Sequence, residues 1–138
     1  MLFAWRNDAA TRAASLSGEV VEFAAHKAWL ERSLENPARR LFIAMNNNAP
    51  VGTARADLSD GVWVLSWTVA PEWRGRGIGK LIGARLVGVF DGAVRAEVKK
   101  ANIASATIAA AAGFEFAGEE AGVLHYRRGP LTQGGFKR

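Results

Sequence analysis

The sequence predicts a single α/β domain built around one mixed β-sheet. Short apolar runs with the composition of strands are interspersed with segments in which apolar residues recur at helical spacing. One strand, expected over residues 62–69, runs directly into a glycine-rich turn that opens a helix, as in α/β folds. The chain has 138 residues, of which 49% are hydrophobic, so it is long enough for one well-buried core and needs no second domain.

The amino-acid composition excludes several classes of site. The chain has no cysteine, which rules out disulfides, thiolate metal ligands and a cysteine nucleophile. The two histidines, His26 and His125, are too few and too scattered for a typical zinc site, and we expect no metal. No apolar run approaches the ~20 residues of a membrane span, and the N-terminus lacks the features of a signal peptide. We therefore expect a cytoplasmic protein without a membrane partner.

The chain is basic, with a formal net charge of +5 and a sequence pI near 10.2. This charge permits binding to nucleic acid or to another polyanion, and charge alone does not distinguish them. The tightest group of cations, Arg74, Arg76 and Lys80, lies on the glycine-rich turn. A compact phosphorylated ligand explains this group better, so we expect no nucleic-acid partner. The sequence leaves open whether the protein is a monomer or a homodimer.

The N-terminal third is predicted to contain one strand and two helices. Residues 2–5 form a short apolar run that predicts a first strand. Asn7 or Asp8 is expected to cap a helix that ends near Ser15. A second helix is predicted over residues 23–35, where apolar residues and one histidine share a helical face before an Asn-Pro pair ends the pattern.

The rest of the chain predicts strands that alternate with two further helices, in the overall order β-α-α-β-β-β-α-β-α-β-β. One helix, over residues 78–90, ends at an Asp-Gly pair, and an alanine-rich helix runs from a cap at Asn102 to a left-handed C-cap at Gly113. Residues 129–138 include three glycines and few apolar residues, so we expect a flexible tail after a domain over residues 1–128. The strands are expected over residues 41–45, 51–56, 62–69, 93–98, 114–118 and 123–128.

The glycine-rich turn after residue 69 has the features of a diphosphate-binding loop. Gly75, Gly77 and Gly79 leave no Cβ to block close approach, and they permit backbone conformations that aim consecutive N–H groups at one anion. The helix that begins near Gly77 or Ile78 adds its unpaired N-terminal donors. A Walker A loop does not fit, since its first glycine and its hydroxyl are missing, and the glycine spacing is not that of a dinucleotide-binding fingerprint.

The pattern Arg74-x-x-Gly77-x-Gly79, preceded by Val-Ala-Pro-Glu, resembles motif A of the GNAT N-acetyltransferases, which bind acetyl-coenzyme A (acetyl-CoA). The predicted order of elements matches the fold of that family, a mixed sheet that splays where two parallel strands part and admits the cofactor. The resemblance implies acetyl-CoA as cosubstrate, with its diphosphate on the backbone amides from Arg74 to Gly79 and its thioester carbonyl on the N–H of Val69. The cofactor-binding residues that it implies are Val69, Arg74, Gly75, Arg76, Gly77, Ile78, Gly79, Lys80, Asn102 and Ser105.

A second stretch, over residues 102–114, resembles another signature of the same family. The pattern is an asparagine, a small residue three positions later, an apolar-tyrosine pair and a final Gly-Phe. Every position matches except the tyrosine, which in many relatives is proposed to protonate the departing thiolate and is Ala109 here. If the chain is catalytic, the proton for the departing thiolate must then come from water, from another hydroxyl or by direct transfer. Asn102 and Ser105 also have an ordinary explanation as helix-capping residues.

A general base for the attacking amine has only weak candidates in this sequence. The strand over residues 62–69 contains no carboxylate, although relatives often place a glutamate there. The alternatives are Asp57, at the end of the preceding strand, and His26, whose unperturbed pKa is ~6.5. A histidine on an apolar helical face is also readily explained as a packed residue. Tyr126, the only tyrosine, is expected to pack in a strand near the C-terminus.

The N-terminal third also resembles the opening of acetyltransferases that modify nucleotide-linked amino sugars, as in pseudaminic acid biosynthesis. This resemblance implies an acetyl group moved from acetyl-CoA to a primary amine by direct attack in a ternary complex. Tryptophans offer flat surfaces for a sugar or a base, and packing in the core explains them as well. The residues that carry the resemblance are Trp5-Arg6-Asn7-Asp8, Thr11-Arg12, His26-x-x-Trp29 and Leu34-x-x-Pro37.

Three alternatives remain open on the sequence. In the first alternative, the acceptor amine belongs to a protein or peptide, which the basic surface permits. In the second, the chain is a non-catalytic acyl-CoA-binding domain, which the missing tyrosine and the lack of an obvious base favour. The third alternative, binding to nucleic acid, rests on net charge alone.

Overall fold

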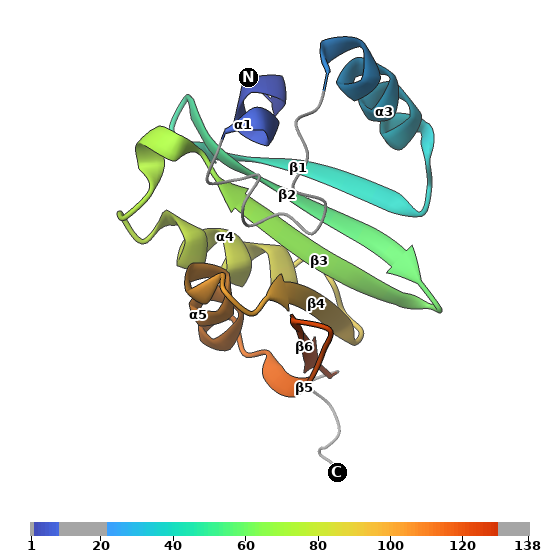
Figure 1. The fold of residues 1–138 in the computed structure, drawn as a ribbon, viewed down its shortest axis with the longest axis vertical. Coiled ribbons are helices and arrows are strands. Elements are labelled where there is room, and N and C mark those ends of the chain that lie inside the picture. Colours follow the sequence, from blue (N-terminus) through green and yellow to red (C-terminus); the bar gives the residue numbers. More distant parts are fainter. Residues whose placement is uncertain (1, 9–21, 130–138) are drawn as a thin grey trace.

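The computed structural model describes residues 2–8 and 22–129. These residues form one six-stranded mixed sheet with helices on both faces, and the predicted α/β class is confirmed (Figure 1). The strands are β1 (Arg39–Asn46), β2 (Ala49–Ser59), β3 (Val62–Val69), β4 (Val94–Lys99), β5 (Glu115–Glu120) and β6 (Val123–Arg128). The helices are α1 (Leu2–Asn7), α3 (Phe23–Glu35), α4 (Ile78–Val87) and α5 (Ile103–Ala111), with a short 3-10 helix, η1 (Pro71–Trp73).

The sheet has the order β1-β2-β3-β4-β6-β5 and contains one parallel pair. β1, β2 and β3 form an antiparallel meander, and β4 joins β3 in parallel after the chain has passed through α4. β6 pairs antiparallel with β4, and β5 pairs antiparallel with β6 at the sheet edge. The two parallel strands therefore lie in the middle of the sheet. Each is followed by a helix, and these helices, α4 and α5, lie side by side (Figure 1).

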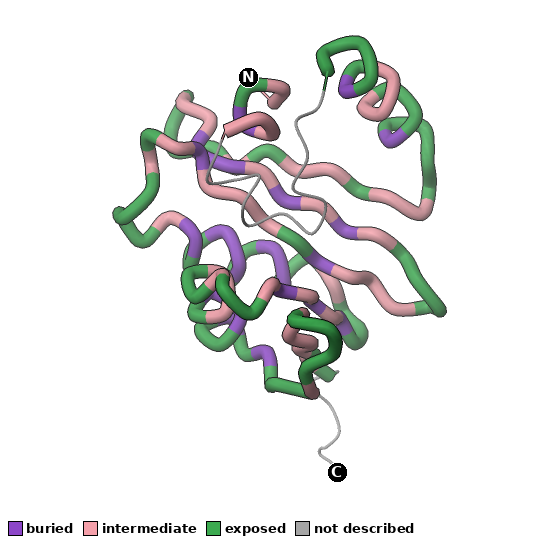
Figure 2. Tube along the Cα trace, viewed as in Figure 1, coloured by how far each residue is buried: buried purple, intermediate pink, exposed green. Residues whose placement is uncertain are grey.

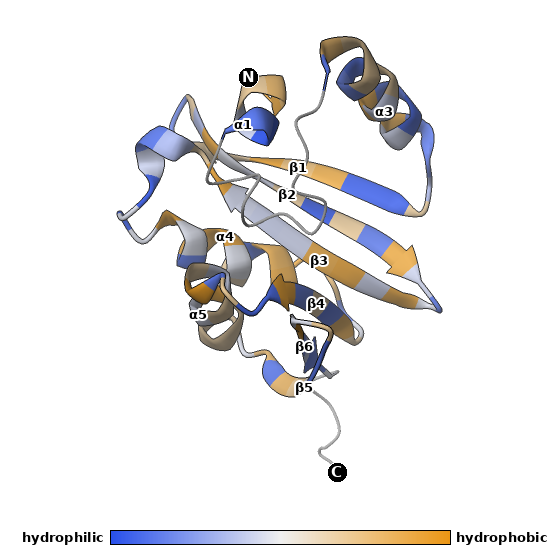
Figure 3. Ribbon diagram, viewed as in Figure 1, coloured by the Kyte–Doolittle hydropathy of each residue, from blue (hydrophilic) through white to orange (hydrophobic). Residues whose placement is uncertain are grey.

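The core lies between the sheet and the pair formed by α4 and α5. Side chains alternate between the two faces along a strand, and the face toward these helices carries small and apolar residues. Figure 2 shows buried positions concentrated on the central strands and on α4, and Figure 3 shows the apolar colouring of α4 and the middle of β3. The core cluster consists of Ala54, Ala56, Leu65, Ile82, Leu86, Val87, Val94, Ala96, Ala109, Ala112 and Phe114.

α4 and α5 approach closely because two glycines of α4 face one isoleucine of α5. A Cβ atom on Gly83 would lie 2.8 Å from Ile108 Cγ2, and one on Gly79 would overlap Ile108 Cδ1. The two glycines are four positions apart, so they lie on the same side of the helix. Gly52 of β2 similarly leaves room for Ile82, since its Cβ would lie 2.7 Å from Ile82 Cδ1. Glycine is therefore a packing requirement at these three positions.

α3 lies on the opposite face of the sheet, against β1, and α1 packs beside α3 (Figure 1). Phe3 of α1 meets Phe23 of α3 edge-on, with ring centres 5.3 Å apart. Trp29 of α3 reaches toward the sheet, where the guanidinium groups of Arg39 and Arg55 lie 5.5 and 5.8 Å from its ring centre. On the same face, the polar side chains of β4 and β6 remain partly exposed.

Most predicted elements are confirmed, with ends that differ by at most three residues. The predicted first strand is wrong, because residues 2–5 belong to α1, in which Trp5 is buried. An apolar run of this length does not distinguish a strand from a turn of helix. Beyond residue 8, the helix expected to end at Ser15 lies outside the described residues, and so does the expected tail after Gly129.

Candidate active site

The two parallel strands part before they end. β3 and β4 are paired at three positions, the last of which joins Leu65 to Ala96. Beyond that point, residues 66–69 of β3 pair with β2, and residues 97–99 of β4 pair with β6. Among the described residues, each of these two stretches has one edge without a strand partner, and we call the place where they part the strand gap. The gap lies at the carboxyl ends of parallel strands, which is where open α/β sheets bind their ligands.

Backbone donors of β3 point into the strand gap. The N–H of Ala70 donates to Val51 O of β2 at 2.8 Å. Successive N–H groups of a strand point to opposite sides, so the N–H of Val69 points away from β2 and toward the gap. The N–H of Trp67, two residues earlier, has the same direction. An extended ligand in the gap would therefore find donors at Val69 and Trp67, and Val69 has the orientation that its predicted role requires.

The glycine-rich turn forms a cradle at the open end of the gap. Gly75 and Gly77 both have a φ of 76°, a left-handed conformation that favours glycine, and Gly77 is the N-cap of α4 without a side-chain capping bond. Among the described residues, no backbone acceptor bonds the amides from Gly75 to Gly79, whereas the Arg74 amide donates to Pro71 O at 3.4 Å. A Cβ on Gly75 or Gly77 would meet nothing within 4 Å. Free donors and open space make this cradle suitable for an anion.

Gly79 differs from the other two glycines of the turn. Its Cβ would point toward Ile108 and lie 3.4 Å from Val69 Cγ2, not toward the open side of the cradle. Its amide still belongs to the first turn of α4, whose donors are unpaired in an ordinary helix. The side-chain position of Gly79 therefore serves the contact between α4 and α5, and only its backbone remains available to an anion.

Two of the three cations on the turn are held by neighbours. Arg74 Nη1 lies 2.9 Å from Asp8 Oδ2, at the end of α1. The guanidinium group of Arg76 stacks 4.9 Å from the ring centre of Trp73. Lys80 is exposed on the first turn of α4. The cradle thus has a cationic rim, and an arriving anion would compete with Asp8 for Arg74.

Asn102 and Ser105 begin α5 on the other side of the gap, after β4. Asn102 Oδ1 accepts a hydrogen bond from the Ser105 amide at 3.1 Å, and Asn102 Nδ2 donates to Ser105 Oγ at 3.0 Å. The helix-capping interpretation of these residues is therefore confirmed. Their position places a second helix N-terminus beside the gap, so the capping role is compatible with contact to a ligand there.

Ala109 occupies a position without space for a larger side chain. It has 0% exposed surface, belongs to the core cluster, and accepts a hydrogen bond from the Phe114 amide at 3.0 Å. A tyrosine at this position would have to displace core residues. Residue 109 therefore does not supply the hydroxyl that the family pattern places near the departing sulfur.

Asp57 lies far from the donors of the strand gap. It is opposite Val64, whereas Val69 is opposite Gly52, which is five residues or about 17 Å away along β2. Both carboxylate oxygens of Asp57 are engaged, one by Arg39 Nε and the other by Arg55 Nε at 2.9 Å. The distance and the double ion pair argue against Asp57 as the base for an amine that attacks near Val69.

His26 is a buried residue of α3 that packs against α1. Its ring lies 5.8 Å from the ring of Phe3 and 5.7 Å from that of Trp29, measured between centres. Burial, and to a smaller degree the charge of Arg6, lowers the pKa of His26 from 6.5. It also lines a cavity of about 400 Å³ between these helices, with Phe23 among the apolar walls. The contacts of His26 are those of a structural residue.

Two titratable residues that the sequence reasoning did not consider together meet beside the gap. Glu97 of β4 is opposite His125 of β6, with Glu97 Oε2 and His125 Nδ1 4.0 Å apart. Glu97 is the first residue of β4 beyond the last pair with β3. The alternation of apolar and polar residues over 94–99 would have identified this face of β4 as the polar one.

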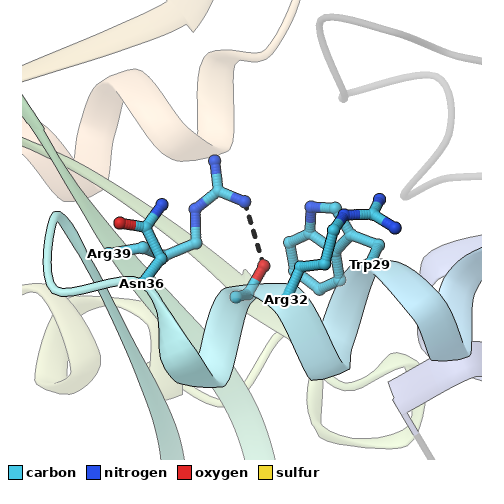
Figure 4. Close-up of a pocket in the computed structure, with 5 residues that line it drawn as sticks. Trp29, Arg32, Asn36 and Arg39 are labelled. Carbon is cyan, nitrogen blue, oxygen red and sulfur yellow. Dashed lines mark hydrogen bonds between the residues drawn. The ribbon is translucent and has the colours of Figure 1, made fainter.

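A second cavity, of about 210 Å³, lies at the corner between α3 and β1 (Figure 4). Arg39 Nη1 donates to Ser33 Oγ at 3.0 Å across it, and Trp29 forms one wall. It lies at the level of Asp57, away from the glycine cradle.

Within residues 2–8 and 22–129, no group of three or more His, Cys, Asp or Glu side chains is placed to hold a metal ion. No helix in this part of the chain is long and apolar enough to cross a membrane.

A glycine-rich turn at the end of a gap between two parallel strands is a type of site that suits a phosphorylated ligand with an extended arm. The profile of the Acetyltransferase (GNAT) family matches residues 2–114, and the chain belongs to this family. It is an acetyl-CoA-dependent N-acetyltransferase. No curated protein sequence matches the chain significantly.

Several solved structures share this fold. The aminoglycoside acetyltransferase AAC(6')-Ib, in complex with ribostamycin and coenzyme A, is 20% identical with a TM-score of 0.83, covering 100% of this chain and 89% of the other. The ribosomal-protein-alanine N-acetyltransferase from Brucella melitensis is 24% identical with a TM-score of 0.74, covering 93% and 91%. The Campylobacter jejuni N-acetyltransferase PseH is 13% identical with a TM-score of 0.70, covering 93% and 86%. At these identities the likeness shows the fold.

Proposed function

We propose that residues 1–128 transfer the acetyl group of acetyl-CoA to a primary amine of a small acceptor, a nucleotide-linked amino sugar. The observation that carries this proposal is the glycine cradle at the open end of the strand gap. No backbone acceptor in the described part of the chain bonds its amides, and the donors of β3 point into the gap. Such a cradle fits the diphosphate of coenzyme A, and the gap fits its extended pantetheine arm, which pairs with β3 like an additional strand.

The cofactor in this proposal is held mainly by the backbone. The amides from Gly75 to Gly79 take the diphosphate, and the cations of the rim add charge. The N–H of Val69, or that of Trp67 deeper in the gap, holds the thioester carbonyl. The residues proposed to contact the cofactor are Val69, Arg74, Gly75, Arg76, Gly77, Ile78, Gly79, Lys80, Asn102 and Ser105.

The reaction that we propose is direct. The amine nitrogen attacks the thioester carbon, the new N–C bond forms, and the developing oxyanion is stabilised by the N–H groups of β3. The C–S bond then breaks, coenzyme A leaves as thiolate, and the ammonium proton passes to a base or to water. The chain contains no cysteine, so no acyl-cysteine intermediate is available. Because Ala109 has no hydroxyl, water is the proposed proton donor for the thiolate.

The acceptor class is supported by the charge of the molecule and by what related proteins act on. The net charge of +5 favours an anionic acceptor such as a nucleotide-linked sugar. Proteins of the same fold include the aminoglycoside acetyltransferase in complex with kanamycin and a spermidine N-acetyltransferase from Vibrio cholerae. Amines of small molecules are therefore the class to test first.

The experiment combines binding and turnover. At a hundred times its dissociation constant, acetyl-CoA should stabilise the fold by ~2.7 kcal/mol, which a thermal-shift assay resolves. Thiol release from acetyl-CoA is then measured with free amino sugars, nucleotide-linked amino sugars, spermidine and a peptide. The proposal expects the highest kcat/KM with a nucleotide-linked amino sugar. The highest value with the peptide would favour a protein acetyltransferase, and binding without any thiol release would identify a non-catalytic acyl-CoA-binding domain.

A further inference from the structure

Two arginines lie directly opposite each other on the partly exposed face of β4 and β6. Arg95 is in register with Arg127, and both side chains point away from α4 and α5, because Val94 and Ala96 point into the core. Like charges in this arrangement destabilise a strand pair. Within the described part of the chain, neither guanidinium group forms an ion pair with a carboxylate. No ion pair among the described residues therefore offsets the repulsion between the two guanidinium groups.

The acidic residues nearest in register do not form ion pairs with the two arginines. Glu97 lies two positions further along β4 on the same face, and its contact at 4.0 Å is with His125. Glu115 lies opposite Arg127 on β5 and is exposed. Neither carboxylate reaches Arg95 or Arg127 at ion-pair distance, so the N–H donors of both guanidinium groups are not used in an ion pair within the described part of the chain.

The arginine pair borders the closed end of the strand gap. Arg95 is in register with Val64 of β3, one position before the last pair that joins the two strands. Glu97 stands at the first level where the strands have parted, two residues or about 7 Å from Arg95 along β4. The arginines and the gap are therefore reached from the same side of the sheet, opposite the side covered by α4 and α5.

We propose that Arg95 and Arg127 bind a phosphate group of the acceptor while its amine points into the strand gap. This inference rests on the proposed function. Guanidinium groups present forked N–H donors that match phosphate oxygens, and two of them side by side supply the charge that a phosphate needs. Arg95 lies at the level of Val64, which is three residues or about 10 Å from Trp67 and five residues or about 17 Å from Val69 along β3. With the thioester carbonyl on the N–H of Trp67, this separation suits a phosphorylated amino sugar. Both a sugar phosphate and a nucleotide-linked sugar provide this chemistry.

The first test measures binding by calorimetry to wild-type protein saturated with coenzyme A, so that the glycine cradle is already occupied. The ligands are glucosamine, glucosamine 6-phosphate and uridine-diphosphate-linked glucosamine. The phosphorylated ligands should bind at least tenfold more tightly than glucosamine, and Arg95→Gln or Arg127→Gln should each remove about tenfold of that affinity. If the nucleotide-linked sugar binds more tightly than the sugar phosphate, the protein also contacts the nucleotide part of the ligand. If the two bind equally, the phosphate group alone accounts for the gain in affinity over glucosamine.

The matched control is Arg85→Gln, which removes the same charge from an exposed position on α4 and should leave all three affinities unchanged. Equal affinity of wild type, Arg95→Gln and Arg127→Gln for the phosphorylated ligands would overturn the inference. Absence of binding of either phosphorylated ligand to the wild type would overturn it as well.

Kinetics separate this inference from the proposed function. With a phosphorylated acceptor, both arginine variants should raise KM about tenfold and leave kcat unchanged. If the wild type releases no thiol with any amine, the proposed function fails, although a phosphate-dependent difference in binding would still support the site. If the wild type acetylates the phosphorylated acceptors and KM does not change in the variants, the inference fails alone.

Discussion

Replacing Gly77 by aspartate should weaken cofactor binding roughly 100-fold through charge. Gly77 has a φ of 76° and is the N-cap of α4, and a Cβ there would meet nothing within 4 Å. An aspartate side chain would therefore enter the open side of the cradle, where the diphosphate is proposed to lie. At a separation of roughly 5 Å and an effective dielectric constant of about 20, two unit charges repel by about 3 kcal/mol, or roughly 100-fold in affinity.

Gly77→Asn is the matched control for this variant. Asparagine has nearly the same shape, tolerates the left-handed conformation as well as aspartate does, and carries no charge. Both variants therefore share any cost of the backbone and of the added atoms, and their difference isolates the charge. Calorimetric titration with coenzyme A should give a dissociation constant roughly 100-fold higher for Gly77→Asp than for Gly77→Asn. Equal affinities of the two variants would refute the placement of the diphosphate.

Three further predictions concern stability. Gly83→Ala places its Cβ 2.8 Å from Ile108 Cγ2, so urea unfolding should show a loss of about 1–3 kcal/mol; no loss would contradict the helix packing. Asp57→Asn should cost about 1 kcal/mol, since it breaks two partly exposed ion pairs, and should leave kcat unchanged; a large fall in kcat would restore Asp57 as a catalytic candidate. The lowered pKa of His26 means that the unfolded chain binds this proton first. The contribution of His26 to the free energy of unfolding should be fully present above pH 6.5 and decrease as the pH falls below it. His26→Gln should flatten this pH dependence of the thermal unfolding temperature.

The glycine cradle could be predicted from the sequence because its determinants are local. A turn that needs positive φ at Gly75 and Gly77, followed by a helix without a side-chain cap, is encoded within a few consecutive residues. The cap formed by Asn102 and Ser105 is local in the same way. The helix over Phe23–Glu35 was predicted with its observed bounds, since its periodic face is long enough to be distinctive.

Features that depend on strand register could not be predicted in the same way. The distance of Asp57 from Val69 follows from their partners across β2 and β3, which no local pattern specifies. The packing role of Gly79 depends on Ile108, nearly thirty residues later in the chain. The four-residue apolar run at the N-terminus is too short for its period to distinguish a strand from a helix, so the strand predicted there is wrong.

The places of the two tryptophans of β3 also depend on distant partners. Trp63 and Trp67 pack against the core, Trp63 near Phe90 and Trp67 near Phe114. Their places follow from the alternation along β3, which turns odd-numbered residues toward α4 and α5. Trp29 is different, since it lies half-buried beside two arginines.

A crystal structure of the protein with coenzyme A tests the central claim most directly. We predict diphosphate oxygens at hydrogen-bond distance, about 2.7–3.2 Å, from amide nitrogens between Gly75 and Gly79, with the pantetheine arm between β3 and β4. A diphosphate bound elsewhere, with those amides left to solvent, would contradict it.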